Sequence, residues 1–165
     1  MLNLKKALKS RLGQAKKIAI LGVGSDLRGD DAAGVIVAGY FSRRDTGPKR
    51  AKYRVFIGAT APENLTGQIK KFKPTHLIVI DSAELGSSAG KARLIGAEEL
   101  SGASFYTHKL PLKIMVDYLR QAIGCDSLII GIQPKQTSFG SLPSREIKTA
   151  ARQVFTAIKD VLRNK

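Results

Sequence analysis

The chain has little cysteine, few aromatic residues and no long apolar run. Its single cysteine, Cys125, excludes a disulfide within the chain and suits a reducing compartment, so we expect a cytoplasmic protein. No apolar stretch reaches the roughly 18 residues that a membrane-spanning helix needs, so no membrane span is expected. The N-terminus lacks the apolar segment and cleavage site of a secretory signal peptide.

Acidic residues are also scarce: 13 of them face 28 lysines and arginines, which gives a net charge of +15. Such an excess can indicate nucleic-acid binding. However, aromatic residues make up only 6% of the chain, which leaves few rings on which bases could stack. No helix-turn-helix, zinc-finger or RNA-binding signature accompanies the charge. We therefore favour a solvated basic surface over nucleic-acid binding, with an acidic protein partner as a further alternative.

A length of 165 residues predicts a single domain with its own core. Residues 1–16 are expected to form a basic N-terminal helical extension, because leucines recur there at helical spacing. The strands predicted along the rest of the chain are 17–23, 53–57, 77–80, an edge strand at 91–95, and 128–132. The predicted helices are 31–42, 62–72, 109–122 and one that Ser144 caps. This alternation predicts an α/β fold: a three-layer sandwich whose mostly parallel twisted sheet of about five strands carries helices on both faces.

The stretch from Ile18 to Tyr40 reads as a buried strand, a glycine loop at Gly22 and Gly24, and a helix. A glycine loop before a helix usually binds phosphate, because backbone N–H groups and the helix dipole attract anions. Here Asp30 and Asp31 stand where the loop becomes the helix, and two carboxylates favour a cation instead. The plainer alternative is that one aspartate caps the helix and the other stabilises its dipole.

Three acidic or imidazole features stand at strand ends or before helices: the Asp30–Asp31 pair, Asp81 and His108. Ligands of open α/β sheets bind beyond the carboxyl ends of the strands, so we expect these loops to converge. Two carboxylates and one imidazole are a ligand set for a divalent metal such as zinc or nickel. The other histidine, His76, is interpreted as a structural or surface residue.

Other site chemistries fit the sequence less well. A dinucleotide-binding fingerprint would need a third glycine where Leu27 stands. No P-loop and no serine nucleophile elbow is present. Cys125 is interpreted as a buried residue rather than a nucleophile. We therefore expect no organic cofactor.

Residues 22–31, Gly-Val-Gly-Ser-Asp-Leu-Arg-Gly-Asp-Asp, resemble the opening motif of the [NiFe]-hydrogenase maturation endopeptidases. Asp81 at the end of its strand and Tyr-Thr-His-Lys-Leu-Pro-Leu at 106–112 resemble that family's second and third motifs in order and spacing. Segments 58–64 and 130–135 resemble the branch that processes the hydrogenase-3 (formate hydrogenlyase) type of large subunit. The chain thus resembles this family through five motifs in order, within residues that run from about 17 to 160.

This resemblance implies an endopeptidase, a hydrolase of the aspartyl protease type, that removes the C-terminal extension of the nickel-loaded large-subunit precursor. It implies that Asp31, Asp81 and His108 are catalytic and bind the metal. The nickel would be carried by the substrate, and another divalent metal at the same site is an alternative. The substrate-facing loop would comprise Gly22, Gly24, Ser25 and Asp30, the last of which is expected mainly to cap the helix.

The sequence departs from the family pattern at Ser25, where asparagine is usual, and at Ala32, where glycine is common. Two mechanisms stay open: the metal polarises the scissile carbonyl or activates water, or it is only a recognition handle while a carboxylate acts as general base. Two other functions also stay open, a basic nucleic-acid or anion-binding domain and a non-catalytic maturation chaperone.

Overall fold

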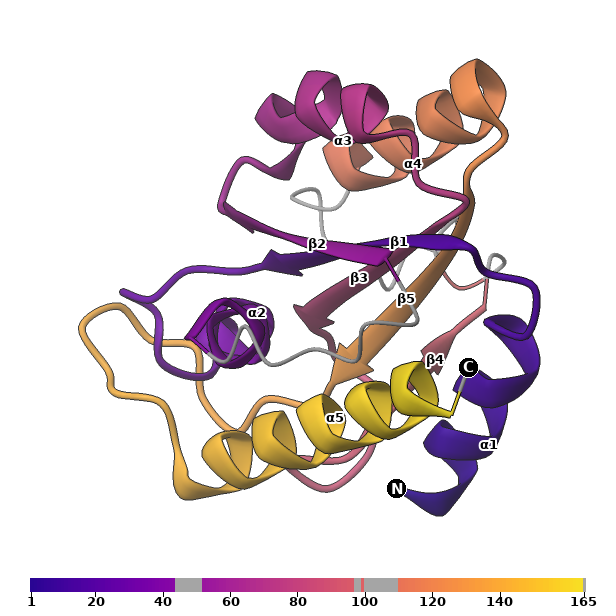
Figure 1. The fold of residues 1–165 in the computed structure, drawn as a ribbon. Coiled ribbons are helices and arrows are strands. Elements are labelled where there is room, and N and C mark those ends of the chain that lie inside the picture. The colour runs from indigo at the N-terminus through magenta and orange to yellow at the C-terminus, as the bar shows by residue number, and fades with distance from the viewer. Residues whose placement is uncertain (44–51, 97–98, 100–109, 165) are drawn as a thin grey trace.

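A single sheet lies between two layers of helices in the computed structural model, which describes residues 1–43, 52–96, 99 and 110–164 (Figure 1). Its five strands are ordered β2-β1-β3-β5-β4. They are β1 (Lys17–Val23), β2 (Lys52–Ala59), β3 (His76–Ser82), β4 (Ala92–Ile95) and β5 (Asp126–Ile132). The predicted α/β sandwich is confirmed.

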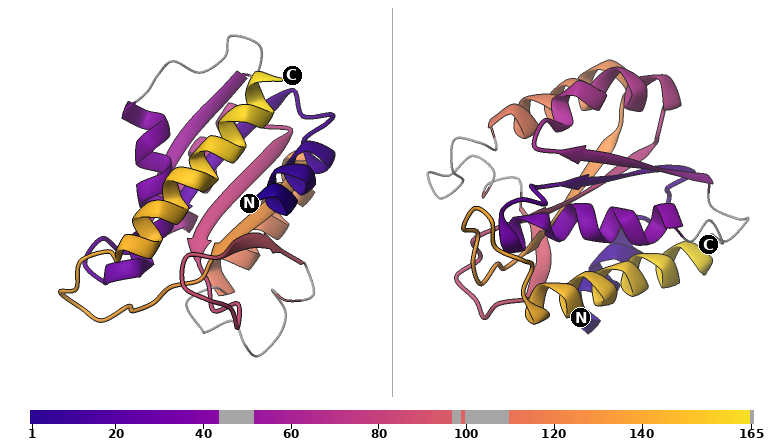
Figure 2. Two further views of the ribbon diagram at one scale, coloured as in Figure 1. Left: turned by 90° about the horizontal axis from the view of Figure 1, so that it is seen from below. Right: turned by 90° about the vertical axis from the view of Figure 1, so that its left-hand side faces the viewer.

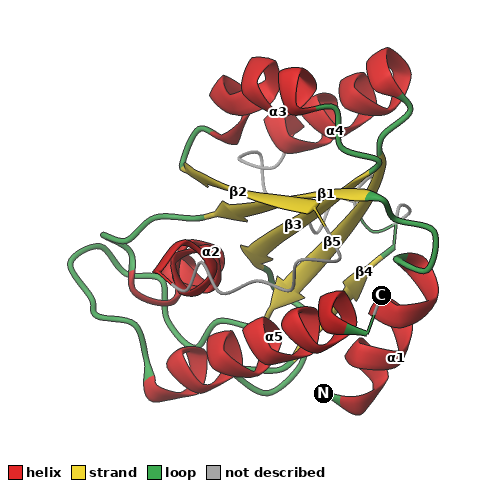
Figure 3. Ribbon diagram, in the orientation of Figure 1, coloured by secondary structure: helices red, strands yellow, loops and turns green. Residues whose placement is uncertain are grey.

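The helices divide between the two faces of the sheet (Figures 2 and 3). One face is covered by α1 (Leu2–Arg11), α2 (Ala33–Arg43) and α5 (Arg145–Arg163), and the other by α3 (Thr66–Phe72) and α4 (Leu110–Ile123). Two short 3-10 turns, η1 (Gly29–Ala32) and η2 (Pro62–Leu65), precede α2 and α3. No helix within the described ranges is long and apolar enough to cross a membrane.

The central strands read as unbroken apolar runs because helices bury both of their faces. Ile78 and Ile80 of β3 pack on the α2 and α5 side, whereas Leu77 and Val79 pack on the α3 and α4 side. All four side chains are fully buried. The core is therefore double, with one apolar cluster on each side of the sheet.

Strand direction decides where a site can form. Parallel pairing joins β1 to both β2 and β3, and β3 to β5, while the edge strand β4 is antiparallel to β5. The carboxyl ends of β1, β3 and β5 therefore meet at one edge of the sheet, toward which their arrowheads point in Figure 1. The predicted edge strand at 91–95 is confirmed.

The basic N-terminal helix packs into the domain. Leu4, Leu8 and Leu12 are buried in the same cluster as the inner face of α5. An ion pair of 2.6 Å between Lys5 and Asp160 joins the two helices at the surface. The predicted helix is thus confirmed over Leu2–Arg11, and its apolar face is part of the core.

The start of α2 lies unusually close to the sheet. A Cβ on Gly34 would lie 1.9 Å from the backbone oxygen of Ile80, and one on Gly22 would lie 2.4 Å from that of Gly34. Gly24 has φ +126°, and a Cβ there would meet the carbonyl of Asp31. Only glycine permits these three approaches, and they bring η1 and α2 directly onto β1 and β3.

Gly34→Ala should lower the free energy of unfolding by about 3 kcal/mol, because the new methyl group overlaps the backbone of β3. The matched control is Gly39→Ala in the same helix, where an added Cβ would meet nothing within 4 Å. That change should raise stability by up to about 1 kcal/mol through helix propensity. Urea unfolding of both variants measures the difference, and equal stabilities would contradict the close packing of α2.

Candidate active site

The loop after β1 and the end of β3 meet at the carboxyl edge of the sheet, and both carry predicted site residues. Asp30 and Asp31 lie in η1, and Asp81 is the next-to-last residue of β3. Ser82 follows it as the last residue of that strand. The loop that carries Asp30 and Asp31 and the strand end that carries Asp81 therefore lie at the same edge of the sheet.

The carboxylate of Asp31 is fixed by two hydrogen bonds. The Ser25 backbone N–H donates to Oδ2 at 2.9 Å, and the Ser82 hydroxyl donates to Oδ1 at 2.7 Å. The side chain is half-buried. Asp31 therefore joins its own loop to the end of β3, and its orientation is set before any ligand arrives.

Asp81 is almost fully buried, with 5% of its surface exposed. Because successive side chains of a strand face opposite sides, Asp81 lies on the α3 and α4 side while Ser82 faces η1. His108 precedes α4 in the sequence and lies outside the described residues. In the part of the chain that is described, no three His, Cys, Asp or Glu residues group as a metal site. The ligand set with His108 thus stays a prediction.

Asp30 has a different task from Asp31. Its carboxylate is fully buried and accepts hydrogen bonds from the backbone N–H groups of Lys135 (2.7 Å), Gln136 (3.3 Å) and Ser144 (2.6 Å). The Ser144 hydroxyl donates a fourth bond at 2.9 Å. Asp30 therefore ties the loop after β1 to the loop between β5 and α5, and its buried carboxylate presents no surface to a substrate.

The prediction that Asp30 caps a helix is wrong, because no side chain caps η1. Two N–H groups at its start donate instead to the distant loop: that of Gly29 to the Ser141 oxygen at 3.0 Å and that of Asp30 to the Gln136 oxygen at 2.9 Å. With these donors satisfied by main-chain oxygens, the acid is not needed as a cap. The cap predicted at Ser144 is confirmed, since its hydroxyl accepts from the Ile147 N–H at 3.2 Å.

Ser25 contributes to the site mainly through its backbone. Its N–H holds Asp31, while its buried hydroxyl accepts from the Leu27 N–H at 3.3 Å. A main-chain donor does not depend on the side chain. The serine that stands where asparagine was expected therefore leaves the contact with Asp31 intact.

Gln133 is a residue of this edge that sequence reasoning missed. Its side-chain oxygen accepts from the N–H groups of Leu85 (2.7 Å) and Ser87 (3.3 Å), and its amide donates to Glu84 at 3.0 Å. It is buried and fixes the loop that follows β3. The sequence signal for Gln133 is its position in the family motif at 130–135, but that motif alone does not indicate what the side chain does.

These elements match a known family over most of the chain. The model of the hydrogenase maturation protease family, HycI, matches residues 37–164. The chain belongs to this family. It is therefore a hydrolase that acts on a peptide bond, as the resemblance of its motifs implied.

Individual relatives agree with the family match. A putative hydrogenase maturation protease of Methanocaldococcus jannaschii is 32% identical over 163 residues, which cover 96% of each chain. The hydrogenase 3 maturation protease of Escherichia coli is 29% identical over 141 residues, covering 85% of this chain and 87% of its own. The crystal structure of a [NiFe] hydrogenase maturation protease, HycI, from Thermococcus kodakarensis has a TM-score of 0.84 at 31% identity, with coverages of 96% and 99%.

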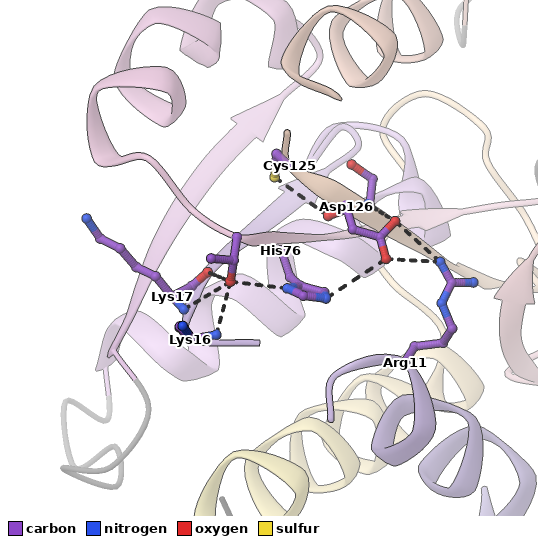
Figure 4. A network of polar contacts seen from close by, with 8 residues as sticks. Arg11, Lys16, Lys17, His76, Cys125 and Asp126 are labelled. Atoms are coloured by element: carbon purple, nitrogen blue, oxygen red, sulfur yellow. Dashed lines mark hydrogen bonds and ion pairs between the residues drawn. The ribbon is translucent and has the colours of Figure 1, made fainter. Parts of the chain in front are cut away.

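Two residues with reactive side chains lie at the opposite edge of the protease, where the strands begin (Figure 4). His76 contacts the Thr75 hydroxyl at 3.1 Å and the Asp126 carboxylate at 3.9 Å. Cys125 is buried, and desolvation together with the nearby Asp126 charge raises its pKa to about 12. The interpretations of His76 as structural and of Cys125 as buried are confirmed.

Asp30→Ala should lower the free energy of unfolding by at least about 3 kcal/mol, because it leaves several buried N–H groups without an acceptor. Asp26→Ala, at an exposed position of the same loop, is the matched control and should change stability by less than about 0.5 kcal/mol. Chemical denaturation gives both values. A stable Asp30→Ala variant would contradict the bracing role of this carboxylate.

The Cys125 thiol should not react with Ellman's reagent in the native protein at pH 8, because only the thiolate attacks and burial opposes ionisation. After unfolding in urea, one thiol per chain should react within minutes. Absorbance of the released thiolate measures both states. Rapid stoichiometric labelling of the native protein would show that the thiol is accessible.

Proposed function

We propose that the protease removes the C-terminal extension of a nickel-loaded [NiFe]-hydrogenase large-subunit precursor. In this proposal Asp31, Asp81 and His108 contact the nickel that the precursor carries. The observation that supports it most is the hydrogen bond from Ser82 to Asp31, since it fastens the loop of one acid to the strand end that carries the other. The name of the Escherichia coli relative, a hydrogenase 3 maturation protease, supports the same substrate class.

The donor set suits a metal that arrives with the substrate. Carboxylates and imidazole bind nickel and zinc, and three protein ligands leave coordination positions open for groups of the precursor. A nickel ion bound by both the precursor and the protease would make cleavage depend on a correctly loaded precursor. We also propose that the protease works in the cytoplasm, where its one thiol stays reduced.

Two roles for the aspartates follow from this arrangement. In one, they hold the nickel of the precursor, which supplies Lewis-acid chemistry to the scissile carbonyl or to a water molecule. In the other, the nickel only positions the precursor, and a carboxylate takes the proton of the attacking water, as in an aspartyl protease. Both roles require Asp31 to keep the orientation that Ser25 and Ser82 give it.

Asp31→Asn, Asp81→Asn and His108→Ala should each slow cleavage of the nickel-loaded precursor by at least about 100-fold, because each removes a metal contact or a base. The matched control is Asp26→Asn, which changes an exposed acid of the same loop and should leave the rate unchanged. The mass of the intact precursor over time gives the rates. Full cleavage by Asp31→Asn and His108→Ala would overturn the proposed site.

A further inference from the structure

Three large apolar side chains are exposed on the two loops beside the candidate active site. Leu27, in the loop after β1, is 58% exposed, and Phe139 and Leu142, in the loop between β5 and α5, are 74% and 78% exposed. We call these three residues the apolar platform. Exposed aromatic and leucine side chains that gather at one place on a soluble domain usually mark an interaction surface.

Hydrogen bonds join the two loops of the apolar platform. The Gly140 N–H donates to the Leu27 oxygen at 2.8 Å, and the Gly29 N–H donates to the Ser141 oxygen at 3.0 Å. Figure 1 shows the two loops running side by side at the left of the molecule. Beneath them the Asp30 carboxylate accepts its four hydrogen bonds. Hydrogen bonds thus hold the backbone that carries the exposed side chains. These loops would therefore lose little conformational entropy when a partner binds.

The apolar platform shares a loop with the candidate active site. Leu27 follows Ser25 by two residues, and Ser25 donates the backbone hydrogen bond that orients Asp31. The Leu27 N–H is itself bonded to the Ser25 hydroxyl at 3.3 Å. A chain segment that covers the platform would therefore lie against the loop that positions Asp31.

Charges beside the platform indicate the chemistry of its occupant. Arg28 and Arg145 are exposed next to it and form no ion pair with a described residue, whereas Lys135 pairs with Glu146 at 2.7 Å. Asp26 is an exposed acid of the same loop. Together with the net charge of +15, these cations favour a partner whose apolar residues are flanked by acidic ones.

We propose that the apolar platform is the docking surface for an apolar, acid-flanked segment of the large-subunit precursor. This inference rests on the proposed function and extends it, because it assigns substrate recognition to side chains that contact no metal. Docking there would hold the precursor while its nickel and scissile bond reach the aspartates. A second copy of this chain is the competing occupant, and the experiment separates the two.

The test is steady-state cleavage of nickel-loaded precursor by the double variant F139S/L142S. KM should rise at least tenfold while kcat stays within twofold, because the platform binds the substrate and does no chemistry. Arg28→Glu should raise KM at least threefold at low salt. The matched control is Leu2→Ser, which removes an 83% exposed leucine on α1 and should change neither constant. Because all these side chains are exposed, unfolding temperatures should match that of the wild type.

A wild-type KM in the double variant would overturn the docking surface. A second result would also overturn it: in sedimentation the wild type is a dimer and the double variant a monomer, while both have the same KM. The occupant of the platform would then be a second copy of this chain. If the wild type cleaves no precursor, the proposed function fails by itself. Calorimetric binding of the precursor then decides the inference: at least tenfold weaker binding by the double variant supports it, and equal or absent binding of both proteins overturns it.

Discussion

The site depends on the hydrogen bonds that the buried carboxylate of Asp30 accepts. It accepts four hydrogen bonds from a loop that follows it by more than a hundred residues, and so joins the first loop of the sheet edge to the last one. A buried carboxylate without such donors would be very costly, so the two loops can fold only as a pair. This arrangement also fixes the backbone of the neighbouring Asp31, whose side chain faces the end of β3.

A second constraint is the close contact between α2 and the strands. Gly22 and Gly34 remove the side chains that would keep the helix away from β1 and β3. The approach brings η1 near enough for Ser82 to reach Asp31. The hydrogen bonds of Asp30 fix the loop after β1, and the close contacts of the two glycines fix the start of α2 against the sheet. In the proposed function, the Asp31 carboxylate, which lies between these two fixed segments, takes part in the chemistry.

The amount that sequence alone could predict follows from how local each signal is. The strand at 17–23 was predicted with its observed bounds, because an unbroken apolar run ending in glycine is a local pattern. The cap at Ser144 was equally local. The partners of Asp30 could not be predicted, because they lie more than a hundred residues away and are mostly backbone groups. The same distant loop satisfies the start of η1, which is why the expected acidic cap is absent. His108 came from the family resemblance and lies outside the described residues.

The measurement that tests the central claim most directly is the intact mass of a large-subunit precursor incubated with the wild-type protease, with and without prior nickel loading. The nickel-loaded precursor should lose the mass of a C-terminal peptide, while the nickel-free precursor should keep its full mass. Equal cleavage of both forms would contradict recognition of the nickel at Asp31 and Asp81. An unchanged mass of both, with the precursor bound, would instead indicate a chaperone.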